Sequence, residues 1–146
     1  VFEAVLARQP LRPLDFEQRM QAVKAFRELP ESGSLAAANK RIRNILRKAD
    51  SAIPAHYDAG LFQENAEREL ASALQQLDAQ TRDLFEARDY TNALCQLAAL
   101  QAPVDTFFDD VMVMTEDTAL RDNRLALLQS LSNLFLQVAD ISLLQD

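Results

Sequence analysis

The chain has 146 residues, of which 49% are hydrophobic and 25% are charged, and its formal net charge is -7. These values exclude a disordered chain, and the length suits one domain, which we expect to span residues 1–146. The longest apolar runs are far short of the ~20 residues that a membrane span needs. With one cysteine an internal disulfide is excluded, and we expect a cytoplasmic protein. Because the sequence starts at Val1 inside a pattern of structured sequence, we also expect a fragment of something longer.

Long segments rich in Ala, Leu, Glu, Gln and Arg predict an all-α bundle of five to six helices. The first is expected to open near Asp15, where Asp15 and Gln18 have the spacing of a D-x-x-Q capping box. Pro30 and Gly33 are expected to end it. Its apolar positions recur at intervals of three or four residues and define one helical face: Phe16, Met20, Val23 and Phe26.

The second helix is expected to begin at the N-cap Ser34 and to reach about Asp50, with Pro54 closing the loop that follows. Wound at about 100° per residue, it separates into two faces. The apolar arc predicts the buried side: Leu35, Ala38, Ile42, Ile45, Leu46 and Ala49. The opposite arc holds the polar positions: Lys40, Arg41, Arg43, Asn44, Arg47 and Lys48.

Four further helical segments complete the predicted bundle. They cover about 65–87, 89–100, 103–110 and 116–139, and Pro103 fits the N1 position of the short third one. The last carries a line of apolar residues at intervals of three and four, which predicts one stripe facing a core: Leu120, Leu127, Leu128, Leu131, Leu134, Phe135 and Val138.

The cationic arc of the second helix is the most informative pattern in the sequence. Five of the chain's 15 basic residues lie between positions 40 and 48, with no acid among them. One interpretation is an ordinary solvated helix face. The other is a surface for a polyanion, because like charges three or four residues apart repel by a few tenths of a kcal/mol and a merely solvated face usually mixes signs. Phosphates of RNA or DNA are the commonest such partner.

No pattern predicts a catalytic residue or a metal site. The carboxylates of Asp105, Asp109 and Asp110 could hold a metal or act in acid–base catalysis, but without a partner motif a polar helix end is favoured. Cys95 could form a nucleophile pair only with His56, the single histidine, and a small core residue is favoured. Gly-rich phosphate loops, H-E-x-x-H and paired cysteines are all missing.

His56 and Tyr57 follow the basic helix in a predicted loop. Aromatic rings in loops can stack on unpaired bases, so a base-stacking role is one hypothesis for them. The other is that they are ordinary loop residues.

Three segments resemble the C-terminal domain of the β subunit of bacterial glycyl-tRNA synthetase. They are RPLDFEQRMQAVKAF near the start, LAAANKRIRNIL in the basic helix, and PVDTFFDDVMVMTEDTALRDNRLALLQSLSNLFLQVADISLLQ at the end. That domain is similar to the DALR-type anticodon-binding domain of arginyl-tRNA synthetase. The segment KRIRNILRKA of this chain resembles a helix of the arginyl enzyme that carries a similar pattern. The segment DTALR, 117–121, is the counterpart of the motif that names the domain, with Thr118 as an extra residue inside it.

The resemblance implies an all-α domain that binds the anticodon end of glycine tRNA, rather than DNA or a membrane. It implies an α2β2 parent enzyme that joins glycine to tRNA with ATP and magnesium, while this fragment itself is no enzyme and needs no cofactor. The partners would be glycine tRNA, the α subunit and the rest of the β subunit. The alternative is a protein-docking module whose basic helix binds an acidic surface of another domain or subunit.

Within that domain we expect the basic helix to contact the RNA. The residues expected to hold phosphates are Lys40, Arg41, Arg43, Arg47 and Lys48. Asn44 and Asn39 are the candidates for base edges, because an amide can both donate and accept hydrogen bonds.

Overall fold

The computed structural model describes residues 1–6, 13–49 and 52–144, and these ranges contain helices and no strand. The prediction of an all-α fold is confirmed. None of the helices in these ranges is long and apolar enough to cross a membrane. In chain order the α-helices are α1 (Phe2–Leu6), α2 (Pro13–Arg27), α3 (Ser32–Lys48), α4 (Asn65–Glu86), α5 (Tyr90–Leu97), α6 (Gln101–Asp110) and α7 (Thr118–Leu136). Three short 3-10 segments are η1 (Ala59–Leu61), η2 (Ala98–Leu100) and η3 (Ile141–Leu144).

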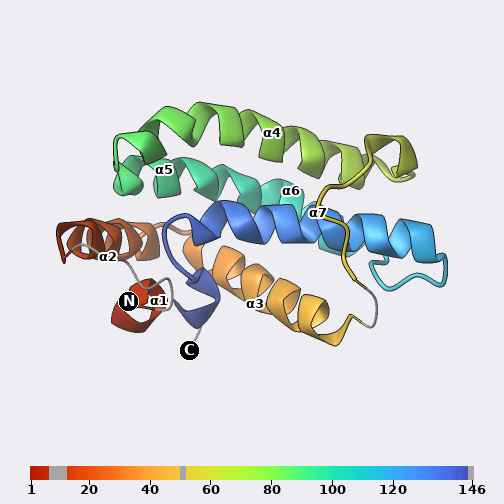
Figure 1. Ribbon diagram of the computed structural model, residues 1–146, viewed down its shortest axis with the longest axis horizontal. Helices are drawn as coiled ribbons and strands as arrows, with labels where there is room; N and C mark the ends of the chain where they lie inside the picture. The colour runs from red at the N-terminus through yellow and green to blue at the C-terminus, as the bar shows by residue number, and fades with distance from the viewer. Residues whose placement is uncertain (7–12, 50–51, 145–146) are drawn as a thin grey trace.

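Helix α7 runs through the middle of the bundle, with α4 on one side and α3 on the other (Figure 1). Helices α5 and α6 follow one another along α4. The two ends of the described chain meet, because α1 packs on η3 and the Asp140 N–H donates to the Ala4 carbonyl at 3.1 Å. The sequence predicted six of the seven α-helices of the described ranges; α1 was not expected.

The middle of α7 is buried on every side. All residues from Asn123 to Leu128 are buried, so the prediction of a single apolar stripe understates the burial of this helix. The predicted stripe itself is buried except at Leu120, which is half-buried. Because α3 and α4 both pack on α7, this helix fixes their relative positions.

A buried ion pair ties α7 to the start of α4. Arg124 donates to the Glu67 carboxylate at 3.1 Å and to the Met112 carbonyl at 2.7 Å. The Glu67 side chain has no exposed surface, and the same carboxylate oxygen accepts the Glu64 N–H at 3.1 Å in the first turn of α4. These bonds hold the loop between α6 and α7 against α4.

The predicted capping box at Asp15 is wrong. Helix α2 already begins at Pro13, and the Asp15 carboxylate turns inward to accept hydrogen bonds from Arg19 at 2.7 Å and from the Tyr90 hydroxyl at 2.5 Å. Burial alone would raise the pKa of Asp15, but the hydrogen bonds from Tyr90 and Arg19, with the charge of Arg19, hold that pKa below its usual value. Asp15 therefore fastens α2 to α5, while the buried Gln18 amide oxygen has no partner among the described residues.

Other predicted helix ends are also shifted. Helix α3 begins at Ser32, so Gly33 lies in its first turn and Ser34 is no cap; the Ser34 hydroxyl donates to Asp105 of α6 at 3.1 Å. Pro103 is the third residue of α6 rather than the first, because the chain continues into α6 from η2. Helix α7 ends at Leu136, three residues before the predicted end.

Candidate nucleic-acid interface

Helix α3 has the predicted rotation. It packs against α7, α6 and η3, and Leu35, Ala38 and Ile42 are buried in the core. The rest of the apolar arc, Ile45, Leu46 and Ala49, is half-buried and packs on the same core. The helix ends at Lys48, and residue 50, where the sequence suggested its end, lies outside the described residues.

The opposite face of α3 is exposed and positively charged. Its five cationic side chains are all exposed: Lys40, Arg41, Arg43, Arg47 and Lys48. This arrangement confirms the predicted separation of the two faces, and the contact of these residues with RNA stays a prediction.

Neighbouring elements hold some of these side chains in place. The Arg41 guanidinium lies 4.3 Å from the centre of the Phe108 ring on α6, a cation–π contact that leaves its N–H groups available. Arg43 lies 3.8 Å from the Asp140 carboxylate, so the face has one nearby acid that the sequence did not indicate. In the described part of the chain no acid lies within ion-pair distance of Lys40 or Lys48.

The two asparagines differ in accessibility. Asn39 is 5% exposed, and its amide donates to the Leu35 carbonyl at 3.0 Å, so it lies beneath the exposed face, and its contact with a base edge stays a prediction. Asn44 stays on the cationic face, half-buried, with its carbonyl oxygen accepting a hydrogen bond from Arg47 at 2.9 Å. Within the described residues its NH₂ group has no hydrogen-bond partner, so Asn44 stays a candidate.

The carboxylates and the thiol considered for chemistry lie in different surroundings. Asp105 accepts the hydrogen bond from Ser34, while Asp109 and Asp110 are exposed at the end of α6. Within the ranges that the structure describes, no three His, Cys, Asp or Glu side chains are placed to hold a metal ion. Burial raises the pKa of the Cys95 thiol, which disfavours the thiolate that a nucleophile needs.

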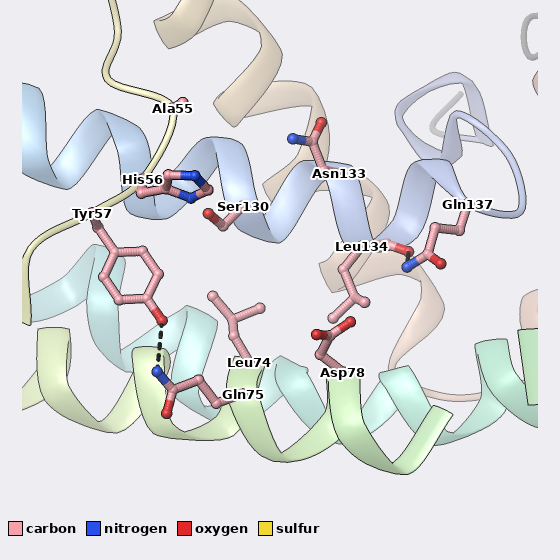
Figure 2. A pocket seen from close by; sticks show the side chains of 10 residues that line it. All are labelled: Ala55, His56, Tyr57, Leu74, Gln75, Asp78, Ser130, Asn133, Leu134 and Gln137. Atoms are coloured by element: carbon pink, nitrogen blue, oxygen red, sulfur yellow. Dashed lines mark hydrogen bonds between the residues drawn. The ribbon is translucent and has the colours of Figure 1, made fainter. Parts of the chain in front are cut away.

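The segment after α3 lines a groove of about 490 Å³ between α4 and α7 (Figure 2). Tyr57 stacks on Phe62 with ring centres 5.6 Å apart and accepts a hydrogen bond from Gln75 at 3.3 Å. His56 is exposed at the rim. The groove is lined by Ala55, His56, Tyr57, Leu74, Gln75, Asp78, Ser130, Asn133, Leu134 and Gln137. The sequence suggested a ligand contact only for His56 and Tyr57, because the other walls come from helices far away in the chain.

A family model for the DALR anticodon binding domain matches residues 35–142, from the basic helix to the segment after α7. The match includes both the cationic face and the groove. The chain belongs to the DALR anticodon binding domain family. Its DTALR segment lies at the start of α7, where the Asp117 carboxylate caps the helix by accepting the Leu120 N–H at 3.3 Å. The extra residue, Thr118, is the first residue of that helix.

Curated relatives of this DALR domain chain are glycine–tRNA ligase beta subunits. The chain is 57% identical over 142 residues to that of Aeromonas salmonicida and 56% identical over 145 residues to that of Shewanella sediminis. It is 55% identical over 144 residues to that of Pseudomonas aeruginosa strain LESB58. The alignments cover 97% to 99% of this chain but only 21% of each relative, so the chain spans about a fifth of their length.

Proposed function

We propose that this chain is the tRNA anticodon-binding module of a glycyl-tRNA synthetase β subunit. Two findings support the proposal: the family match over residues 35–142 and the identity of 55% to 57% with beta subunits of glycine–tRNA ligases. On this proposal the chain does not activate glycine; it holds glycine tRNA so that the complete enzyme can charge it.

The observation that carries the proposal is the exposed cationic face of α3. In a chain of net charge -7, the acidic surface repels a polyanion except where positive charge is concentrated. Lys and Arg side chains there would hold the phosphates, and Asn44 would reach a base edge of the single-stranded loop. The contacts of Arg41 with Phe108 and of Arg47 with Asn44 reduce the freedom that these side chains would lose on binding RNA.

The proposal extends to the parent enzyme. The complete ligase would be an α2β2 assembly in the cytoplasm that uses ATP and magnesium, with its amino-acid-activating site in the α subunit. The names of the relatives support a ligase with more than one kind of subunit.

The salt dependence of RNA binding tests this function. Three or four phosphate contacts with a single-stranded loop should make log affinity fall with log salt with a slope of roughly -2 to -3, because each neutralised phosphate contributes about -0.7. Lys48→Ala should make the slope shallower by about 0.7. The matched control is Lys24→Ala, which removes an exposed lysine from α2 and should leave the slope unchanged.

Binding of a glycine anticodon stem–loop to the chain, measured by fluorescence anisotropy across a salt series, gives both slopes. A flat salt response, or equal slopes for the Lys48 and Lys24 variants, would contradict the proposal. That result would favour the alternative, in which the cationic face docks on an acidic protein surface.

A further inference from the structure

The residues that line the groove between α4 and α7 suit a planar molecule with polar groups on its edge. Leu74 of α4 and Leu134 of α7 form an apolar floor, each less than a tenth exposed. Polar groups surround this floor, and Figure 2 shows Asp78 projecting from α4 towards α7. The volume of about 490 Å³ lies in the range of small-molecule pockets, roughly 300–1,000 Å³.

Besides α4 and α7, the groove has a third wall, formed by residues 55–57 of the segment after α3. Contacts within the protein hold this segment in place before any ligand binds. Asn123, buried on α7, accepts the Asp58 N–H at 2.6 Å and donates its amide to the Asp58 carbonyl at 3.0 Å. The stacking of Tyr57 on Phe62 fixes the neighbouring ring. Because hydrogen bonds hold the Asp58 backbone and the Tyr57 ring is packed on Phe62, this segment would lose little conformational freedom on binding a ligand.

Two of the polar groups that line the groove, Asp78 and Ser130, offer acceptors to a ligand that donates hydrogen bonds. Asp78 is an acceptor, and its only ion-pair partner in the described chain is the exposed Arg82 at 3.5 Å. The Ser130 hydroxyl donates to the Ala126 carbonyl at 3.1 Å, so its oxygen is left to accept. Among the residues that the structure describes, no lysine or arginine lines the groove, which makes it unsuitable for a phosphate. A planar ring with an amino group on its edge fits these acceptors.

We propose that this groove binds one unpaired nucleobase that carries an exocyclic amino group. The inference rests on the proposed function, which brings a single-stranded RNA loop to this domain. The base would lie over Leu74 and Leu134, with its amino group donating to Asp78. The His56 imidazole at the rim would cover its exposed side, since bases stack on aromatic side chains. The cationic face of α3 would hold the phosphates, and the groove would read the base.

Free nucleotides test the groove without the rest of the RNA. His56 is the only histidine in the chain, so its imidazole gives one set of ring C–H signals in proton NMR. Cytidine monophosphate should shift these signals in a saturable titration, whereas uridine monophosphate, which has a carbonyl in place of the amino group, should bind roughly tenfold more weakly. Equal shifts from both nucleotides, or no shift from either, would overturn the proposal.

A charge-matched pair of variants tests Asp78 within an RNA. Each cytosine in the loop of a glycine anticodon stem–loop is replaced in turn by uracil, and binding to the chain is measured. At one position the replacement should weaken wild-type binding roughly tenfold. Asp78→Asn should reduce that ratio towards one, because an amide can donate to the uracil carbonyl. Asp83→Asn, on the same helix but outside the groove, removes the same charge and should keep the ratio.

The groove proposal can fail while the proposed function stands, and the two failures give different results. If Lys48→Ala changes the salt slope but Asp78→Asn leaves the cytosine-to-uracil ratio unchanged, the groove proposal is wrong and the RNA-binding function stands. If wild-type chain shows no salt-dependent RNA binding at all, the proposed function is wrong and the groove proposal falls with it.

Discussion

Helices α3 and α4 lie on opposite sides of α7 and share one design, a buried apolar face and an exposed polar one (Figure 1). Their exposed faces differ. That of α4 mixes signs, and Arg82 lies 3.5 Å from Asp78 one turn earlier, a spacing at which opposite charges stabilise a helix. That of α3 carries five cations, and its one ion-pair contact within the described residues, from Arg43 to Asp140, involves an acid from a different part of the chain.

The comparison shows that a helix face of mixed charge in this molecule forms an ion pair within its own helix. If solubility were the only requirement, α3 would gain stability from acids placed among its cations, as α4 does. We propose that a ligand supplies the negative charge that offsets the repulsion on α3. The following predictions test that explanation, and they are ordered by the size of the effect.

The largest effect should come from the buried faces, where the two helices are alike. Ile42→Ala on α3 and Leu70→Ala on α4 each remove a side chain with no exposed surface and should each lower the free energy of unfolding by about 2–5 kcal/mol. Ile45→Ala should have a smaller effect, because Ile45 is only half-buried. Urea denaturation followed by circular dichroism measures all three. If Ile45→Ala proves more destabilising than Ile42→Ala, the rotation of α3 is wrong.

An intermediate effect should follow from making α3 resemble α4. Asn44 has basic residues three and four positions away in both directions, namely Lys40, Arg41, Arg47 and Lys48. Asn44→Glu should therefore raise the free energy of unfolding by about 0.2–0.5 kcal/mol for each ion pair formed, while weakening RNA binding. Thermal unfolding and RNA titration of the same sample measure both changes.

The control for this variant is Asn44→Gln, which keeps an amide and adds no charge. It separates the loss of the asparagine from the gain of a carboxylate. If Asn44→Glu stabilises the chain and leaves RNA binding at the wild-type level, the cationic face does not bind RNA. The difference in charge between α3 and α4 would then have no role in RNA binding.

The smallest effect should come from the two exposed ion pairs. Arg43→Ala breaks the contact with Asp140, and Arg82→Ala breaks the contact with Asp78. Both pairs are solvent-exposed on the arginine side, so each should contribute about 0–1 kcal/mol to stability. Only the Arg43 variant should also weaken RNA binding. A large loss of stability in Arg43→Ala would mean that this arginine serves the fold rather than the ligand.

Periodic patterns predicted much of the fold. The intervals of three and four residues placed Val23 and Phe26 in the core and turned Ile42 inward, and the structure confirms these positions. Helix ends were predicted less well. Asp15 and Ser34 look like caps in the sequence, but both side chains bond to distant helices instead, Asp15 to Tyr90 and Ser34 to Asp105.

For the candidate site too, some features could be predicted from the sequence and others depend on how the helices pack. The sequence alone determined the cationic face of α3, because all of its residues lie within three turns of one helix and helical geometry puts them together. Only the tertiary structure decided that Asn39 is buried, that Asp140 approaches Arg43, and that α4 and α7 build a groove around Tyr57. Those facts depend on how separate helices pack, and a residue contributed from across the core leaves no local pattern in the sequence.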